Sequence, residues 1–128
     1  MSRVLKFLYF WGPVILWMGV IFFFSSRTKV AVSDEYVLNF IFFKSLHVIE
    51  YGILFFFSYR ATYNLEKNKS RAFIYAAAIT ILYAISDEIH QTFIPTREGT
   101  VRDVFIDMIG IAIMYMYIRK SEFMKRFI

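Results

Sequence analysis

Four apolar runs divide the chain, and clusters of charged and polar residues separate them. The runs cover residues 4–24, 45–62, 72–91 and 102–118. A helix of about 20 residues is roughly 30 Å long, which is enough to cross the hydrocarbon core of a bilayer. The pattern therefore predicts an all-α membrane protein with four transmembrane helices in an antiparallel bundle. We expect one domain over residues 1–128.

The first run follows Arg3 and contains Lys6 near its start, as a signal peptide would. However, the run is longer than the ~7–15 residues of a signal-peptide core, and no small-residue cleavage site follows it. We therefore interpret it as a retained span.

The composition supports a membrane environment. Hydrophobic residues make up 59% of the chain and aromatic residues 21%, more than a soluble core of 128 residues can bury. The absence of cysteine excludes disulfides, thiolate metal sites and cysteine nucleophiles. The net charge of +5 comes from basic residues at the ends of apolar runs, which suits lipid headgroups better than nucleic acid. We expect membrane lipids, and no nucleic acid, as partners.

The distribution of lysine and arginine predicts the orientation of the spans. Ten of the 15 basic residues lie in the N-terminus, the loop after the second run and the C-terminal tail. The other five lie in the first and third loops, on the opposite side of the bilayer. By the positive-inside rule, both termini are expected in the cytoplasm and the third loop outside.

The last three runs carry their ionisable residues at one level. These residues lie at the start of the second run, the end of the third and the start of the fourth, which antiparallel spans bring to the same outer face. A charge at the bilayer centre costs ~2.5–3.5 kcal/mol on insertion scales, so we expect the polar stripes to face one another around a hydrogen-bonded cavity. The set comprises Lys44, His47, Glu50, Tyr51, Asp87, Glu88, His90, Gln91, Arg102, Asp103 and Asp107, with Arg97 on the turn beyond.

Helical spacing also offers structural explanations for single members of the set. Asp103, Asp107 and Gly110 share one face of the fourth run, where the glycine would allow close helix approach. Thr100 and Asp103 have the spacing of an acidic capping box. An ion pair with a basic neighbour such as Lys44 would account for Asp107.

Two kinds of chemistry are compatible with these residues. In an enzyme, His47 would act as general base, while carboxylates orient it and the cations stabilise negative charge. A serine at the end of the first run would be the nucleophile if that span lies alongside. The catalytic candidates are His47, Glu50, Asp87, Glu88 and Asp103. The ligand-binding candidates are Lys44, Tyr51, Gln91, Arg97, Asp107, Ser25 and Ser26.

The sequence contains only incomplete matches to metal-binding and nucleotide-binding motifs. The segments HVIE and DEIH contain His and carboxylate ligands, but neither is H-E-x-x-H and no spacing singles out a closed zinc site. DEIH has no phosphate-binding G-x-x-x-x-G-K-[ST] loop to accompany it. The sequence therefore predicts no metal and no cofactor.

The order and spacing of these residues resemble the VanZ-like membrane proteins. The first shared pattern is K-x-x-H-x-x-x-Y, and the second is D-E-x-x-Q-x-F-x-P-x-R-x-x-x-x-x-D. They fall on Lys44, His47 and Tyr51, then on Asp87, Glu88, Gln91, Phe93, Pro95, Arg97 and Asp103, with the Ser25–Ser26 pair ending the first run. Thr96 stands where the family usually has Gly, and Arg27 where Gln is common.

The resemblance implies a multi-pass protein of the bacterial cytoplasmic membrane, whose founding relative is linked to resistance to the glycopeptide teicoplanin. It implies no reaction. Three hypotheses follow. The outward site binds an anionic lipid-linked cell-wall precursor or a glycopeptide-related ligand; or the protein is an intramembrane enzyme on such substrates; or it is a small proton-coupled transporter. A transporter of four short spans would need a homo-oligomer.

Overall fold

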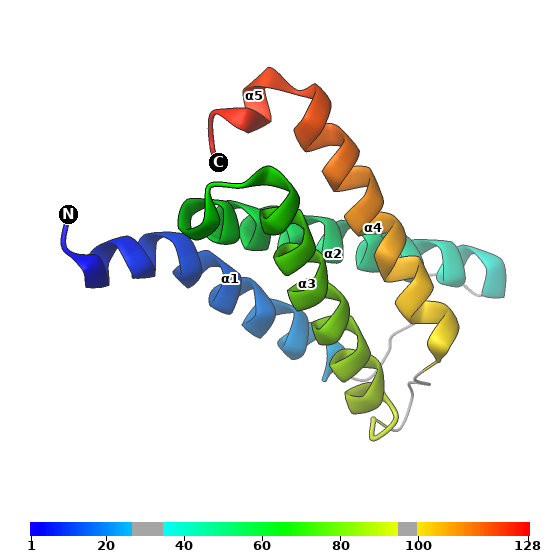
Figure 1. Ribbon diagram of the computed structural model, residues 1–128. Helices are drawn as coiled ribbons and strands as arrows, with labels where there is room; N and C mark the ends of the chain where they lie inside the picture. Colours follow the sequence, from blue (N-terminus) through cyan, green and yellow to red (C-terminus); the bar gives the residue numbers. More distant parts are fainter. Residues whose placement is uncertain (27–34, 95–99) are drawn as a thin grey trace.

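The computed structural model describes residues 1–26, 35–94 and 100–128. Five helices account for the regular structure of this part of the chain, and it contains no strand. They are α1 (Arg3–Ser25), α2 (Tyr36–Glu66), α3 (Lys69–Gln91), α4 (Val101–Lys120) and the short α5 (Glu122–Lys125). Figure 1 shows α2, cyan to green, running crosswise to α3 and α4. The predicted all-helical fold is confirmed over these residues.

Side-chain caps fix where three of the four long helices begin. Ser2 Oγ accepts a hydrogen bond from the Leu5 amide at 3.2 Å, and Asn68 Oδ1 accepts one from the Arg71 amide at 3.0 Å. Thr100 caps α4 as the sequence predicted, since its Oγ1 accepts from the Asp103 amide at 3.3 Å. Such caps satisfy amides that have no partner inside the helix.

Three helices, α1, α2 and α3, are long and apolar enough to cross a membrane. Helix α2 begins nine residues before the predicted span, so its polar side chains lie well inside the helix rather than at its start. Helix α4 is about 30 Å long but also carries charged residues near both ends, and it is not among the three.

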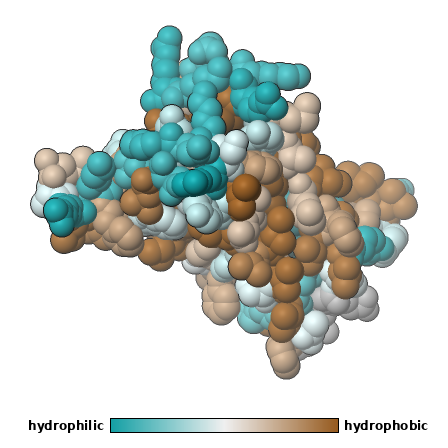
Figure 2. Space-filling model, in the orientation of Figure 1, coloured by the Kyte–Doolittle hydropathy of each residue, from teal (hydrophilic) through white to brown (hydrophobic). Residues whose placement is uncertain are grey.

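The outer surface of the molecule suits lipid. Large apolar side chains lie exposed along all four long helices, for example Leu16, Ile41, Leu82 and Ile113. Figure 2 shows hydrophobic residues along the flanks, with hydrophilic ones gathered over α5 and the neighbouring turn between α2 and α3. A soluble monomer rarely exposes apolar surface on this scale.

Helix α2 forms the centre of the packing and contacts α1, α3 and α4. On one side, Val14 and Ile21 of α1 pack with Leu54 of α2. Two hydrogen bonds fasten α1 to its neighbours: Trp17 Nε1 donates to the Glu50 carbonyl at 2.8 Å, and Tyr83 Oη donates to the Met18 carbonyl at 2.5 Å. Because these polar groups satisfy one another, α1 is held in a defined rotation about its axis.

Two glycines set the distance between α2 and α4. A β-carbon on Gly110 would overlap the carbonyl oxygen of Val48 and lie 3.1 Å from the amide nitrogen of Gly52. A β-carbon on Gly52 would lie 3.2 Å from the carbonyl oxygen of Gly110. The two backbones therefore touch, which confirms the close approach predicted for Gly110.

Candidate functional site

Nine polar side chains from four helices lie together at one end of the bundle, and we call this group the polar cluster. Seven of the nine are buried: four carboxylic acids, one amide and two side chains with a hydroxyl group. The members are Ser25 of α1, Lys44, His47 and Tyr51 of α2, Asp87, Glu88 and Gln91 of α3, and Asp103 and Asp107 of α4. The structure thus brings into one region most of the side chains that the sequence placed at one level.

One part of the polar cluster is a hydrogen-bonded chain centred on Asp87. Tyr51 Oη donates to Asp87 Oδ2 at 2.9 Å, and Gln91 Nε2 lies 3.5 Å from the same oxygen. Gln91 Nε2 also donates to Ser25 Oγ at 3.1 Å. This chain connects α1, α2 and α3 and gives the Asp87 carboxylate hydrogen-bond donors inside the protein.

A second part is an ion pair at the start of α4. Lys44 Nζ lies 2.5 Å from Asp103 Oδ1, and the exposed Arg102 Nε lies 3.9 Å from the same oxygen. Both cations lie over the ring of Phe40, at 5.7 and 5.2 Å from its centroid. Lys44 therefore pairs with Asp103, and the structure does not place it against Asp107.

Glu88 completes the cap of α4. The Thr100 amide donates to Glu88 Oε2 at 3.1 Å. In a capping box, the acid at the third helical position would accept this bond. Here a residue of α3 accepts it, and the Asp103 carboxylate is turned toward Lys44.

The third part joins His47, Glu88 and Asp107, which come from three different helices. His47 Nδ1 lies 3.4 Å from Asp107 Oδ1, and one potential ligand atom from each of the three residues lies within 4.8 Å of the others. Both carboxylate oxygens of Asp107, and Oε1 of Glu88, are buried without a hydrogen-bond partner. The His47 ring stacks nearly parallel to the ring of Tyr51, with centroids 6.4 Å apart.

The inner charges of the polar cluster do not balance. The cluster contains four acids, against Lys44 and a histidine that is charged only when protonated. Two of the acids, Asp87 and Asp103, have close donors, as described above. The other two, Glu88 and Asp107, lie near His47 and have three carboxylate oxygens that receive no hydrogen bond.

The remaining predicted residues lie at the margin or beyond. Glu50 is half-buried on α2, and its carbonyl accepts the bond from Trp17. Ser26 Oγ donates to the Phe22 carbonyl at 2.7 Å, and the His90 ring stacks on Phe22 at 4.7 Å between centroids. Arg97 lies outside the described residues, as do Arg27, Pro95 and Thr96.

Two hollows adjoin the polar cluster. A cavity of about 30 Å³ reaches His47 between α1 and α2, beside Ser25 and Glu50, and is large enough for a water molecule. A shallow and mainly apolar hollow of about 380 Å³ lies along α2 next to Lys44, with Phe40, Ile41 and Val48 among its walls. A cation and an apolar surface thus lie side by side at the edge of the polar cluster.

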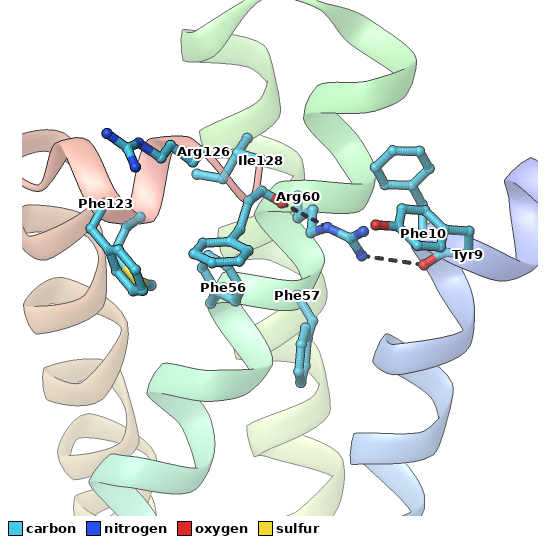
Figure 3. A pocket seen from close by; sticks show the side chains of 10 residues that line it. Tyr9, Phe10, Phe56, Phe57, Arg60, Phe123, Arg126 and Ile128 are labelled. Atoms are coloured by element: carbon cyan, nitrogen blue, oxygen red, sulfur yellow. Dashed lines mark hydrogen bonds between the residues drawn. The ribbon is translucent and has the colours of Figure 1, made fainter.

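A larger hollow of about 410 Å³ lies at the opposite end, around Arg60 (Figure 3). There Arg60 donates to the Phe127 carbonyl at 2.8 Å and to the Tyr9 carbonyl at 3.2 Å. Its guanidinium also lies 4.4 and 4.7 Å from the ring centroids of Tyr9 and Phe10. Because Arg60 is already bound by the chain itself, we interpret this region as a clamp that holds the C-terminal tail.

Gly52 also shapes the site, although it was not among the residues predicted from the sequence. Gly52 contacts Gly110 of α4. This contact brings His47, five residues before Gly52 on α2, close to Asp107 on α4. Gly52 directly follows Tyr51 of the polar stripe, and that neighbourhood is the signal that would have identified it.

Comparison with known proteins agrees with this description. The family model described as VanZ/LLP1 matches residues 10–124, which include every residue of the polar cluster. The match confirms the resemblance drawn from the residues. No curated protein and no solved structure matches the chain.

Proposed function

We propose that this chain, which belongs to the VanZ/LLP1 family, is a bacterial cell-envelope protein that binds the anionic headgroup of a lipid-linked ligand at the polar cluster. The observation that carries the proposal is the burial of so many polar side chains among helices built for a membrane. Ionisable residues inside membrane helices are costly and usually mark a functional site. With its apolar helices and its family membership, the chain is a multi-pass membrane protein.

We place the site at the outer face, with α4 as the fourth span of an antiparallel bundle and both termini in the cytoplasm. Asp103 and Asp107 of α4 are buried against its neighbours, so these acids do not face lipid. The basic residues near the turn between α2 and α3 and on α5 lie at the opposite end from the polar cluster. This distribution supports the positive-inside orientation.

The residues at the edge of the polar cluster favour the binding of an amphiphilic ligand. Lys44 and Arg102 lie beside Phe40, next to the apolar hollow on α2. A phosphate or carboxylate headgroup would pair with the cations while its hydrocarbon tail lies along the hollow. Arg97, a ligand-binding candidate from sequence, lies outside the described residues and is proposed only as a further cation for this ligand. A lipid-linked cell-wall precursor and a glycopeptide-related ligand both have this chemistry, and the resemblance implies an effect on teicoplanin susceptibility.

A second candidate function is an intramembrane enzyme acting on such a lipid. The observation that favours it is the 3.4 Å distance between His47 Nδ1 and Asp107 Oδ1, together with the small cavity that His47 lines. In this scheme His47 acts as general base and Asp107 orients its ring. Asp107 thus takes the orienting role for which the carboxylates Glu50, Asp87 and Asp103 were the candidates from sequence.

The binding proposal is tested with purified protein in lipid nanodiscs. Native mass spectrometry would measure the binding of a polyprenyl phosphate, with the uncharged polyprenol as the matched control lipid. We expect the phosphate to bind preferentially, and Lys44→Ala to weaken its binding about tenfold or more, in line with a charge-assisted contact. The control variant Lys6→Ala changes an exposed cation at the opposite end of α1 and should bind like the wild type.

Equal binding of the phosphate and the alcohol, or full binding by a folded Lys44→Ala protein, would overturn the proposal. A separate readout is the teicoplanin susceptibility of a strain lacking the gene, complemented with either variant. Turnover of the lipid that is lost in His47→Gln would instead favour the enzyme.

A further inference from the structure

We propose that His47, Glu88 and Asp107 bind a divalent transition-metal ion of the Zn²⁺ or Mn²⁺ type. Each ligand comes from a different helix, and one potential ligand atom from each lies within 4.8 Å of the other two. The site is separate from the cations at the edge of the polar cluster. The proposal therefore stands or fails independently of the lipid ligand.

The spacing of these atoms is close to what an ion requires. Ligands about 2.1 Å from a tetrahedral ion lie roughly 3.4 Å from one another. His47 Nδ1 and Asp107 Oδ1 already have this separation, at 3.4 Å. A carboxylate oxygen of Glu88 lies within 4.8 Å of a ligand atom of each of the other two residues, so binding an ion would require the Glu88 side chain to move closer.

The second, independent observation is that the site contains buried oxygens without donors. The side chain of Asp107 is fully buried, and neither of its oxygens has a hydrogen-bond partner. Its nearest donor, His47 Nδ1 at 3.4 Å, lies beyond the usual N–H···O distance. Burying a carboxylate without hydrogen-bond partners is energetically costly. A cation at this position removes that cost.

The other two acids show why the ion belongs at this position. Asp87 receives Tyr51 Oη and Asp103 receives Lys44 Nζ, so both have their own donors. Glu88 is anchored through Oε2 by the Thr100 amide, and its Oε1 is left without a partner. The Thr100 amide would hold the Glu88 carboxylate in position, as hydrogen bonds to metal-binding side chains do in other metalloproteins.

The donor set determines the class of metal. One imidazole nitrogen and two carboxylate oxygens suit Zn²⁺ or Mn²⁺ better than Mg²⁺ or Ca²⁺, which prefer oxygen alone. Three protein ligands leave at least one coordination position open. If the proposed function is also correct, a phosphate oxygen of the headgroup would take that position, and the ion would offset the negative charge of the cluster.

The test uses the full-length protein in detergent, with any affinity tag removed and metal stripped by a chelator. Zn²⁺, Mn²⁺ and Mg²⁺ are then titrated separately by calorimetry, and bound metal is counted by mass spectrometry after desalting. We expect about one Zn²⁺ or Mn²⁺ per chain, with a higher melting temperature in the presence of the metal. Asp107→Asn, His47→Gln and Glu88→Gln should each weaken binding at least tenfold.

The matched controls are His90→Gln, which changes the histidine stacked on Phe22, and Glu122→Gln on the exposed surface of α5. Both should bind metal like the wild type. Stoichiometry near zero, or unchanged affinity in the three ligand variants, would overturn the proposal. If Asp107→Asn does not fold, the other two ligand variants decide the question.

The link to the lipid is measured separately. Polyprenyl phosphate binding is compared with and without the bound metal. If metal binds but does not change lipid binding, the metal site is supported and only its proposed contact with the headgroup is excluded. Lipid binding without metal binding supports the proposed function and overturns the metal site.

Discussion

Gly110 of α4 lies directly against the backbone of α2 at Gly52. A β-carbon on Gly110 would lie 3.1 Å from the Gly52 amide nitrogen and would overlap the carbonyl oxygen of Val48. This contact has a consequence for the candidate site. Asp107 lies one turn before Gly110 on α4, and the close approach brings its carboxylate to His47. The glycine pair therefore sets the geometry of the polar cluster as well as the packing of the helices.

Gly110→Ala should destabilise the fold because the added methyl group has no space between the two backbones. We expect a loss of about 1–3 kcal/mol, the usual cost of overpacking. Gly19→Ala is the matched control, since a β-carbon there meets nothing within 4 Å. The control should be neutral or slightly stabilising, by up to about 1 kcal/mol for a helical glycine. Reversible unfolding in detergent measures both, and equal stability of the two variants would contradict the packing described.

The sequence predicted the helices well because their apolar runs are long and bounded by charges. Helix α2 contains the predicted span of residues 45–62 but begins nine residues before it. Most of the preceding residues, from Tyr36, are also apolar, although Asn39 and Lys44 lie among them. The short α5 was not predicted, since a single turn after Ser121 carries no periodic signal.

The polar side chains could be assigned to one level from sequence, but not to their partners. Spacing along one helix does not fix its rotation relative to another. The sequence offered Lys44 as a partner for Asp107, whereas Lys44 pairs with Asp103 and His47 approaches Asp107. A metal site of His47, Glu88 and Asp107 has no linear motif for the same reason. Its three ligands meet only after α2, α3 and α4 pack.

Tyr51→Phe should destabilise the protein by removing the closest donor to the buried Asp87 carboxylate. The hydrogen bond of 2.9 Å joins a hydroxyl to an acid, and such bonds contribute about 1.5–3 kcal/mol when the acid is charged. A double-mutant cycle with Asp87→Asn measures the coupling. Tyr117→Phe on the exposed face of α4 is the control and should change little. Additive effects of Tyr51→Phe and Asp87→Asn would show that the bond does not contribute.

Arg60→Ala should release the C-terminal tail. Arg60 holds the Phe127 carbonyl and the Tyr9 carbonyl at once, so its loss removes two hydrogen bonds and the contacts with the rings of Tyr9 and Phe10. We expect several-fold faster chymotrypsin cleavage at Phe123, with a loss of about 1–3 kcal/mol in stability. Arg126→Ala changes another arginine of the same hollow and serves as the control. If both variants are cleaved at the wild-type rate, Arg60 does not clamp the tail.

The proposed topology can be tested cleanly because the chain contains no cysteine. Single cysteines are introduced at Phe93, near the end of α3, and at Lys67, in the turn between α2 and α3; both side chains are exposed. If the polar cluster faces outward, a membrane-impermeant maleimide should label Phe93→Cys in intact cells. It should label Lys67→Cys only after the membrane is opened.

A third variant, Phe123→Cys on α5, tests the C-terminal side independently of the first two. Four spans place it with Lys67→Cys, because α4 then returns the chain to the cytoplasm. If α4 does not cross the membrane, Phe123→Cys should instead be labelled together with Phe93→Cys. Labelling of Lys67→Cys but not of Phe93→Cys in intact cells would reverse the orientation and place the polar cluster at the cytoplasmic face. An outward ligand would then be excluded, while the metal site, which depends only on helix packing, would still stand.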